Sequence, residues 1–152
     1  MKKNIIKVLL IMMMSTTLFA IHPETNKLIN KAKQETGEME PKELKKMLAD
    51  DKYVILLDIR EINQRAEGEI FADEHYAITR GSLEFEVLNK IKDKNAPIVT
   101  YCRGGFRSAL AAQTLRKLGY KNAVNLKGGL KNWAKNGFDI ETGLGVTHLY
   151  TK

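Results

Sequence analysis

An apolar run, a lone cysteine and a loop rich in glycine and arginine follow one another in Pro97-Ile98-Val99-Thr100-Tyr101-Cys102-Arg103-Gly104-Gly105-Phe106-Arg107-Ser108. The nearly continuous apolar run is typical of a strand covered on both sides in a parallel sheet. The amphipathic segment 107–118 predicts a helix that ends at Gly119, a left-handed cap. In open α/β sheets the working site lies beyond the carboxyl ends of the strands, and this order of elements places Cys102 there.

The rest of the sequence alternates in the same way between predicted strands and helices. Apolar runs predict strands at 53–58, 76–78 and 123–126. Amphipathic or capped segments predict the helices, at 41–48, 61–66, 83–91 and 130–136. This alternation favours parallel pairing through right-handed crossovers. We therefore expect an α/β fold with an open parallel sheet of about five strands and helices on both faces. The tail, 138–152, has no strong pattern.

The first twenty residues have the pattern of a targeting segment. Three lysines are followed by a short apolar run and by Ala20, as in a secretory signal peptide. The run is short for a transmembrane helix, and an uncleaved anchor is the alternative. We expect an exported protein in the bacterial periplasm, in contact with the membrane only if segment 1–20 is retained. Residues 21–37 are expected to form a lead-in helix or linker, and 38–152 the folded domain.

Charge and cysteine content exclude several classes of function. The formal net charge of +7 comes partly from the lysines of the first twenty residues, and the later basic residues are interleaved with acidic ones. We therefore expect no nucleic-acid partner. Cys102 is the only cysteine, which excludes an internal disulfide framework and a cysteine-clustered zinc site. The three histidines show no paired ligand spacing, so no metal is expected.

The loop after Cys102 has the composition of an anion-binding site. Gly104 and Gly105 permit positive φ angles, which let successive backbone N–H groups face inward. The following helix directs its positive dipole end at the same place, and Arg103 and Arg107 add full charges. Cationic neighbours and helix N-termini lower the pKa of a cysteine. The sequence therefore predicts that Cys102, at the lip of this loop, is a nucleophile.

The segment Cys102–Ser108 resembles the active-site loop of rhodanese-like domains, whose usual pattern is Cys-Arg-x-Gly-x-Arg-Ser. Three further segments resemble the family in the right order: Asp58–Glu61, Arg80–Phe85, and Asn125–Trp133 with its Gly-Gly pair. The likeness covers about residues 38 to 138.

The resemblance implies a sulfurtransferase that needs no cofactor. Cys102 would accept sulfane sulfur from a small-molecule donor, thiosulfate or a persulfide, and would itself become a persulfide. It would then pass the sulfur to cyanide, a thiol or a protein acceptor. The backbone N–H groups of the loop would hold the persulfide and the donor anion; the loop comprises Arg103, Gly104, Gly105, Phe106, Arg107 and Ser108. Arg103 and Arg107 would attract the sulfonate. Asp58 and Arg60, at the carboxyl end of the first strand, are expected to form a supporting ion pair.

Two other functions remain open from the sequence. One is a non-enzymatic sulfur carrier or redox-sensing module that uses the same cysteine. The other is a cysteine-dependent phosphatase or arsenate reductase of the same fold, in which five residues separate cysteine and arginine. Four residues separate Cys102 from Arg107, and the tighter loop favours a sulfur atom. The sequence also has Glu69 where many members of the family have histidine.

Overall fold

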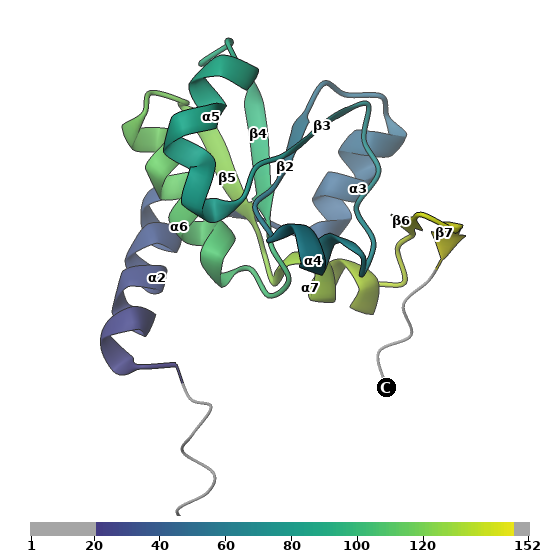
Figure 1. Cartoon of the computed structure of the whole chain (residues 1–152), viewed down its shortest axis with the longest axis horizontal. Helices are drawn as coiled ribbons and strands as arrows, with labels where there is room; N and C mark the ends of the chain where they lie inside the picture. The colour runs from purple at the N-terminus through teal and green to yellow at the C-terminus, as the bar shows by residue number, and fades with distance from the viewer. Residues whose placement is uncertain (1–20, 148–152) are drawn as a thin grey trace, which may run out of the picture.

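Five strands pair in parallel into one sheet in the computed structural model, which describes residues 21–147 (Figure 1). The strand order is β1-β5-β4-β2-β3, and the strands are β1 (Glu38–Met39), β2 (Ile55–Asp58), β3 (Glu74–Ala77), β4 (Pro97–Tyr101) and β5 (Asn122–Leu126). Asp58 is in register with Tyr101, and Thr100 with Asn125, so the carboxyl ends of three strands meet at one edge. The predicted open parallel sheet is confirmed.

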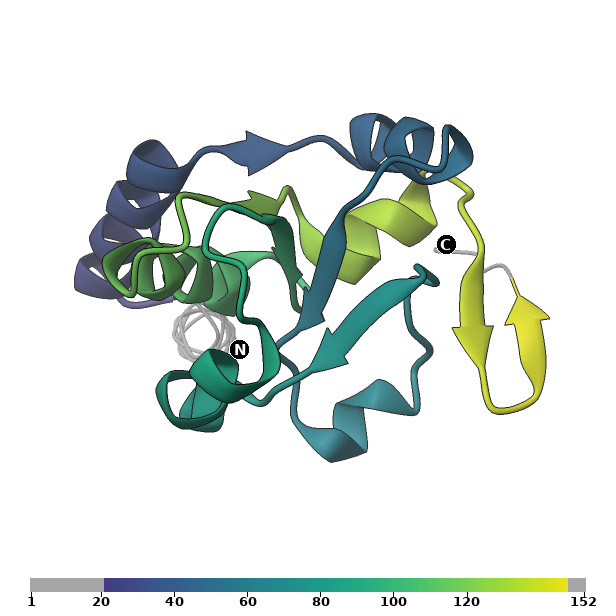
Figure 2. The same ribbon diagram turned by 90° about the horizontal axis from the view of Figure 1, so that it is seen from above.

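Helices cover both faces of the sheet, as predicted (Figure 2). On one face α5 (Leu83–Lys90) and α6 (Phe106–Lys117) pack against alternate side chains of β2 and β4 in one apolar cluster. On the other face α3 (Pro41–Ala49) and α7 (Gly129–Lys135) pack against the intervening side chains. The central strands β2 and β4 are therefore buried on both faces, which explains their continuous apolar sequences.

Two short helical segments complete the connections between strands. Helix α4 (Ile62–Arg65) follows β2, and the 3-10 helix η2 (Arg80–Ser82) leads from β3 into α5. Figure 1 shows α4 and α7 at the same end of the sheet. This is the carboxyl end of the strands, where the sequence placed the working site.

The segment 21–37 contains helix α2 (Pro23–Thr36), which packs on the outer side of α6 (Figure 2). Ile29 and Ala32 of α2 are buried against Ala109 of α6. Of the two predicted alternatives, lead-in helix or linker, the structure contains the helix. Segment 1–20, the predicted signal peptide or anchor, lies outside the described residues.

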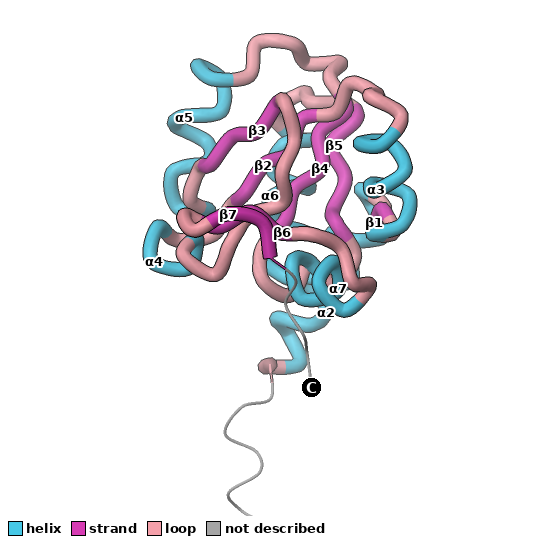
Figure 3. The backbone as a smooth tube through the Cα atoms, turned by 90° about the vertical axis from the view of Figure 1, so that its right-hand side faces the viewer, coloured by secondary structure: helices cyan, strands magenta, loops and turns pink. Residues whose placement is uncertain are grey.

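Three strands have no counterpart in the sequence-based predictions. Strand β1 has only two residues, too few for an alternating pattern, and it pairs with the edge of β5. Strands β6 (Ile140–Thr142) and β7 (Gly145–Thr147) form an antiparallel hairpin beside the sheet (Figure 3). Two backbone hydrogen bonds attach this hairpin to the domain: Glu69 N–H donates to Glu141 O at 2.7 Å, and Glu141 N–H donates to Glu69 O at 2.8 Å. Within residues 21–147 no helix has the length and apolar character needed to span a membrane.

Candidate active site

Cys102 lies in the loop that joins the end of β4 to the start of α6. Gly105, the residue before α6, has a φ of 83°, in the left-handed region that glycine adopts without steric cost. Its backbone N–H donates a hydrogen bond to Cys102 Sγ at a distance of 3.1 Å. At least one amide of the loop therefore faces the sulfur atom.

Backbone N–H groups at the start of α7 donate hydrogen bonds to carbonyl groups of this loop. Leu130 N–H donates to Cys102 O at 2.9 Å, and Lys131 N–H donates to Arg103 O at 3.0 Å. The approach is close enough to require glycine, because a Cβ atom on Gly129 would lie 2.2 Å from Cys102 O. With these carbonyls bound to α7, the loop keeps its amides available for the sulfur.

Cys102 lies deeper than the sequence indicated, at the floor of the loop instead of its lip. The residue is 2% exposed and borders the apolar cluster beneath α5 and α6. Ser108 Oγ lies 3.4 Å from Sγ. Burial acts to raise the pKa of the thiol, but hydrogen bonds from the Ser108 side chain and from the amides of Ser108, Gly104 and Gly105 lower the pKa below its ordinary value. The site thus favours ionisation despite its burial.

The two arginines of the loop bind different partners near α4. Arg107 donates to the neutral Gln64 Oε1 at 2.7 Å. Arg103 forms an ion pair with Glu67 at 3.1 Å, and its side chain is half exposed. The charge of Arg103 is therefore balanced by a carboxylate, whereas the partner of Arg107 carries no charge.

Asp58 and Arg60 form a fully buried ion pair at the end of β2. Two guanidinium nitrogens of Arg60 contact the carboxylate, the closest at 2.6 Å, and both side chains are 0% exposed. Arg60 also donates to Gln64 O at 3.1 Å and to Gly68 O at 2.8 Å. The pair thus holds the segment 64–68, which supplies the partners of both loop arginines.

Comparison with known proteins assigns the chain to a family. The family model described as the rhodanese-like domain matches residues 40–136, which include the Cys102 loop, the Asp58–Arg60 corner and the start of α7. The chain belongs to the rhodanese-like family. The match leaves α2 and β1 outside its limits, along with the hairpin β6–β7.

Similar proteins include two that are described as sulfur transferases. A sulfurtransferase from Allochromatium vinosum is 33% identical over 104 residues, which cover 68% of this chain and 94% of that protein. The polysulfide-sulfur transferase homodimer of Wolinella succinogenes has a TM-score of 0.64 at 29% identity, covering 74% of this chain and 82% of that one. A Rhodopseudomonas palustris protein of unknown function, described as a possible tyrosine phosphatase, has a TM-score of 0.66 at 27% identity, covering 80% and 97%.

The rhodanese-like site departs from the usual family pattern around Glu69. Glu69 Oε2 lies 3.7 Å from His75 Nδ1, and His75 Nε2 lies 3.1 Å from the hydroxyl of Tyr101. Tyr101 packs in the cluster with α3 and α7, whereas Cys102 packs on the opposite face of the sheet. The contacts of Glu69 and His75 therefore lie on the face of the sheet opposite to Cys102.

Sequence reasoning missed three side chains near the sulfur or the loop: Gln64, Glu67 and Asn125. Gln64 and Glu67 follow β2, and the rule that places sites beyond strand ends applies to that loop as well. Asn125 is a buried polar residue inside β5 and accepts a hydrogen bond from Ser108 at 2.6 Å. An amide within the apolar run 123–126 was the available signal.

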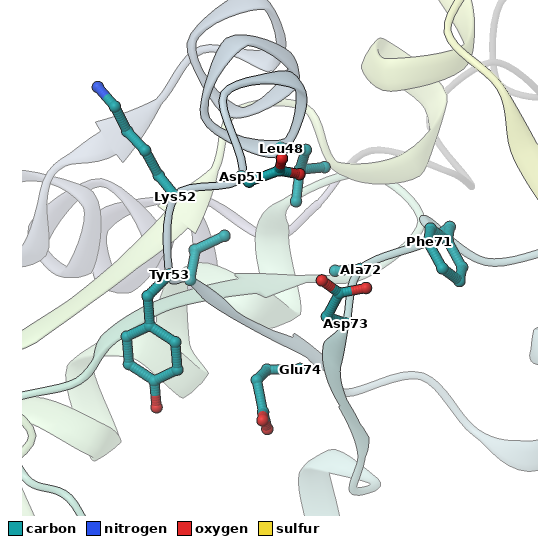
Figure 4. Close-up of a pocket in the computed structure, with 9 residues that line it drawn as sticks. Leu48, Asp51, Lys52, Tyr53, Phe71, Ala72, Asp73 and Glu74 are labelled. Carbon is teal, nitrogen blue, oxygen red and sulfur yellow. The ribbon is translucent and has the colours of Figure 1, made fainter.

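A separate pocket of about 350 Å³ lies at the amino ends of β2 and β3 (Figure 4). Leu48, Tyr53, Phe71 and Glu74 are among its lining residues. It lies at the other end of the parallel strands from Cys102 and contains no residue of the loop. Among residues 21–147 no group of three or more histidine, cysteine or carboxylate side chains is arranged to hold a metal ion.

Proposed function

We propose that this rhodanese-like protein moves sulfane sulfur from a donor such as thiosulfate to cyanide or a thiol through a persulfide on Cys102. The contact of 3.1 Å from the Gly105 N–H to Cys102 Sγ carries the proposal. A thiolate is the reactive form of cysteine, and the lowered pKa of Cys102 supplies it. The similarity to sulfurtransferases supports the same chemistry.

The proposed reaction balances in two displacements. The Cys102 thiolate attacks the outer sulfur of thiosulfate, a new S–S bond forms, and the S–S bond of thiosulfate breaks with its electron pair leaving on sulfite. In the second displacement the acceptor attacks the outer sulfur, and Cys102 leaves as a thiolate. Cyanide departs as thiocyanate, and a thiol acceptor departs as a persulfide. Because the sulfur moves without net oxidation, neither displacement calls for a redox cofactor.

The loop supplies the binding groups for this reaction in our proposal. The amides between Arg103 and Ser108 hold the outer sulfur and the donor anion, in the manner of an oxyanion hole. Arg107 attracts the sulfonate, and its charge is available because Gln64 is neutral. Arg103 contributes less, because Glu67 balances its charge.

The phosphatase and arsenate reductase alternative fits the loop less well. Only four residues separate Cys102 from Arg107, and Gly105 turns its amide onto the sulfur itself. A ring of this size leaves less space for a tetrahedral phosphate than the longer loop of those enzymes.

We also propose export to the periplasm, with residues 1–20 acting as signal peptide or anchor. The support is the lysine-bearing start and short apolar run of that segment. Fractionation of cells together with amino-terminal sequencing of the mature protein tests this. A protein that remains cytoplasmic with its first residues intact would contradict it.

Steady-state transfer from thiosulfate to cyanide tests the proposed activity. The wild-type protein is expected to turn over, and Cys102→Ser is expected to fall to background while its circular dichroism spectrum stays unchanged. Activity of Cys102→Ser above background would overturn the assignment of the nucleophile. A wild-type protein that takes up sulfur but does not turn over would favour the carrier alternative, and phosphomonoester hydrolysis would favour a phosphatase.

A further inference from the structure

A chain of four polar contacts leads from the sulfur to the helix outside the family match. Ser108 Oγ lies 3.4 Å from Cys102 Sγ and 2.6 Å from Asn125 Oδ1. Asn125 Nδ2 donates to Glu38 Oε1 at 2.7 Å, and Lys33 Nζ lies 3.1 Å from the same oxygen. Ser108 and Asn125 are 0% exposed, so water does not replace either partner. Strand β1 and helix α2 therefore reach the nucleophile through β5.

The Ser108 hydroxyl has one hydrogen and two possible acceptors. Asn125 Oδ1 only accepts hydrogen bonds, and a thiolate only accepts as well. When the proton is directed to Asn125, the Ser108 oxygen presents lone pairs to Cys102, which suits a neutral thiol. When the proton is directed to the sulfur, it stabilises the thiolate. The two acceptors compete for the same hydrogen.

The orientation of the Asn125 amide determines whether this competition exists. Glu38 is a carboxylate, which accepts and does not donate, so it holds the amide nitrogen of Asn125 on its own side. Lys33 stabilises the charge of Glu38, and both side chains are about a fifth exposed. If the amide reversed, its nitrogen would donate to Ser108 Oγ and leave the hydroxyl proton to the sulfur.

We propose that Asn125 is a positioning residue that competes with Cys102 for the single proton of Ser108. Glu38, held by Lys33, keeps the amide oxygen of Asn125 turned toward Ser108 and so favours transfer of the hydrogen bond from the sulfur to Asn125. The role of Cys102 as nucleophile is taken from the proposed function. The acidity of the thiol, however, is measured without any sulfur donor, so this inference can fail while sulfur transfer stands.

Other charged groups surround the sulfur and must be separated from the effect of Glu38. Arg103 and Arg107 lie on the loop, and the Asp58–Arg60 pair lies at the end of the neighbouring strand. None of them is linked to Asn125 by the contacts above. The removal of Glu38 also removes a negative charge, which lowers the pKa of a nearby thiol through space, and the experiment must distinguish that effect from the relay.

The pH dependence of iodoacetamide alkylation at Cys102 tests the proposal. In Glu38→Gln the new side chain can donate to Asn125 Oδ1, so the Asn125 amide can reverse. The pKa of Cys102 is then expected to fall by about one unit, a tenfold change in the thiolate fraction on the acid side. Glu40→Gln is the matched control, because Glu40 pairs with Lys127 and not with Asn125; no change is expected there.

The same change in a Ser108→Ala background separates the relay from a through-space effect. Without the hydroxyl, Glu38→Gln is expected to shift the pKa of Cys102 less than it does in the wild-type background, because only the through-space effect of the lost charge remains. An equal shift in both backgrounds, or no shift in either, would overturn the proposal. If Glu38→Gln does not fold, Glu38→Ala is measured in both backgrounds with the same criteria.

Discussion

At the scale of single residues, burial raises the pKa of Cys102 and hydrogen bonds to the sulfur lower it. Transfer of a thiolate out of water is costly, yet the Ser108 hydroxyl, when its proton faces the sulfur, and the amides of the loop compensate for this cost. The sequence predicted the nucleophile and its glycine loop from local composition. It could not predict where the arginines bind, because Gln64 and Glu67 are about forty residues away in the chain.

The lowered pKa of Cys102 predicts the pH profile of alkylation. Only the thiolate reacts, so the rate rises with pH to a plateau. Because the folded-state pKa lies below the ordinary thiol value, the plateau begins at a lower pH than for a free cysteine. Iodoacetamide rates on the folded protein and on a short peptide with one cysteine provide the comparison. A midpoint at or above that of the peptide would contradict the hydrogen-bonding account of the site.

Replacement of Arg107 is expected to weaken the binding of the sulfur donor. Arg107→Ala is expected to raise the KM for thiosulfate about tenfold, the equivalent of about 1.4 kcal/mol, because it removes a charge-assisted contact. Arg103→Ala is the control at the same loop, and its effect is expected to be smaller because Glu67 already balances that charge. Steady-state kinetics measures both. Equal increases in KM would show that the ion pair of Arg103 with Glu67 does not reduce the contribution of Arg103 to donor binding.

At the scale of elements, the loop depends on neighbours that are distant in sequence. The start of α7 binds the carbonyls of Cys102 and Arg103, and the Asp58–Arg60 pair holds the segment 64–68. The central strands were predictable because burial on both faces leaves a continuous apolar run. Strand β1 was not, because two residues carry no periodicity, and the hairpin β6–β7 is mostly exposed and lacks an apolar pattern.

A side chain on Gly129 is expected to displace the Cys102 loop. Gly129→Ala places a Cβ atom within 2.2 Å of Cys102 O, and a shift of about 1 Å at an active site can cost on the order of 100-fold in rate. Gly137→Ala is the control, since Gly137 has a similar left-handed φ of 73° but open space around it. Turnover of thiosulfate measures both. Similar activity in the two variants would show that α7 does not set the loop geometry.

Loss of one partner of the buried pair is expected to destabilise the fold. Arg60→Met leaves the Asp58 carboxylate unpaired at 0% exposure, which costs about 3–5 kcal/mol of the free energy of unfolding. Lys90→Met breaks an exposed pair with Glu86 and is expected to change the free energy little. Urea denaturation followed by circular dichroism measures the difference. Comparable stability in the two variants would contradict a structural role for Arg60.

At the scale of the whole molecule, a rhodanese-like domain is extended by α2 and β1. These elements lie outside the family match, yet α2 is buried against α6, the helix that begins beside the nucleophile. The sequence left helix and linker open for residues 21–37, because the apolar stripe of that segment is weak. Its packing partner, Ala109, is small and gives no signal of contact in the sequence.

Truncation of a side chain in α2 tests whether the helix belongs to the folded unit. Ile29→Ala is expected to destabilise the whole domain by about 2–5 kcal/mol, because Ile29 is 5% exposed. Leu28→Ala, on the 59% exposed neighbour, is expected to have little effect. A single cooperative transition in urea, shifted only in the first variant, is the expected result. Equal midpoints would show that α2 is not coupled to the domain.

The formation of a persulfide on Cys102 is the step on which the account depends most directly. Mass spectrometry of the protein after incubation with thiosulfate, followed by digestion, measures it. One added sulfur atom is expected on the peptide that contains Cys102, and its loss is expected after cyanide is added. An unmodified Cys102 peptide after incubation with thiosulfate would contradict the proposed function.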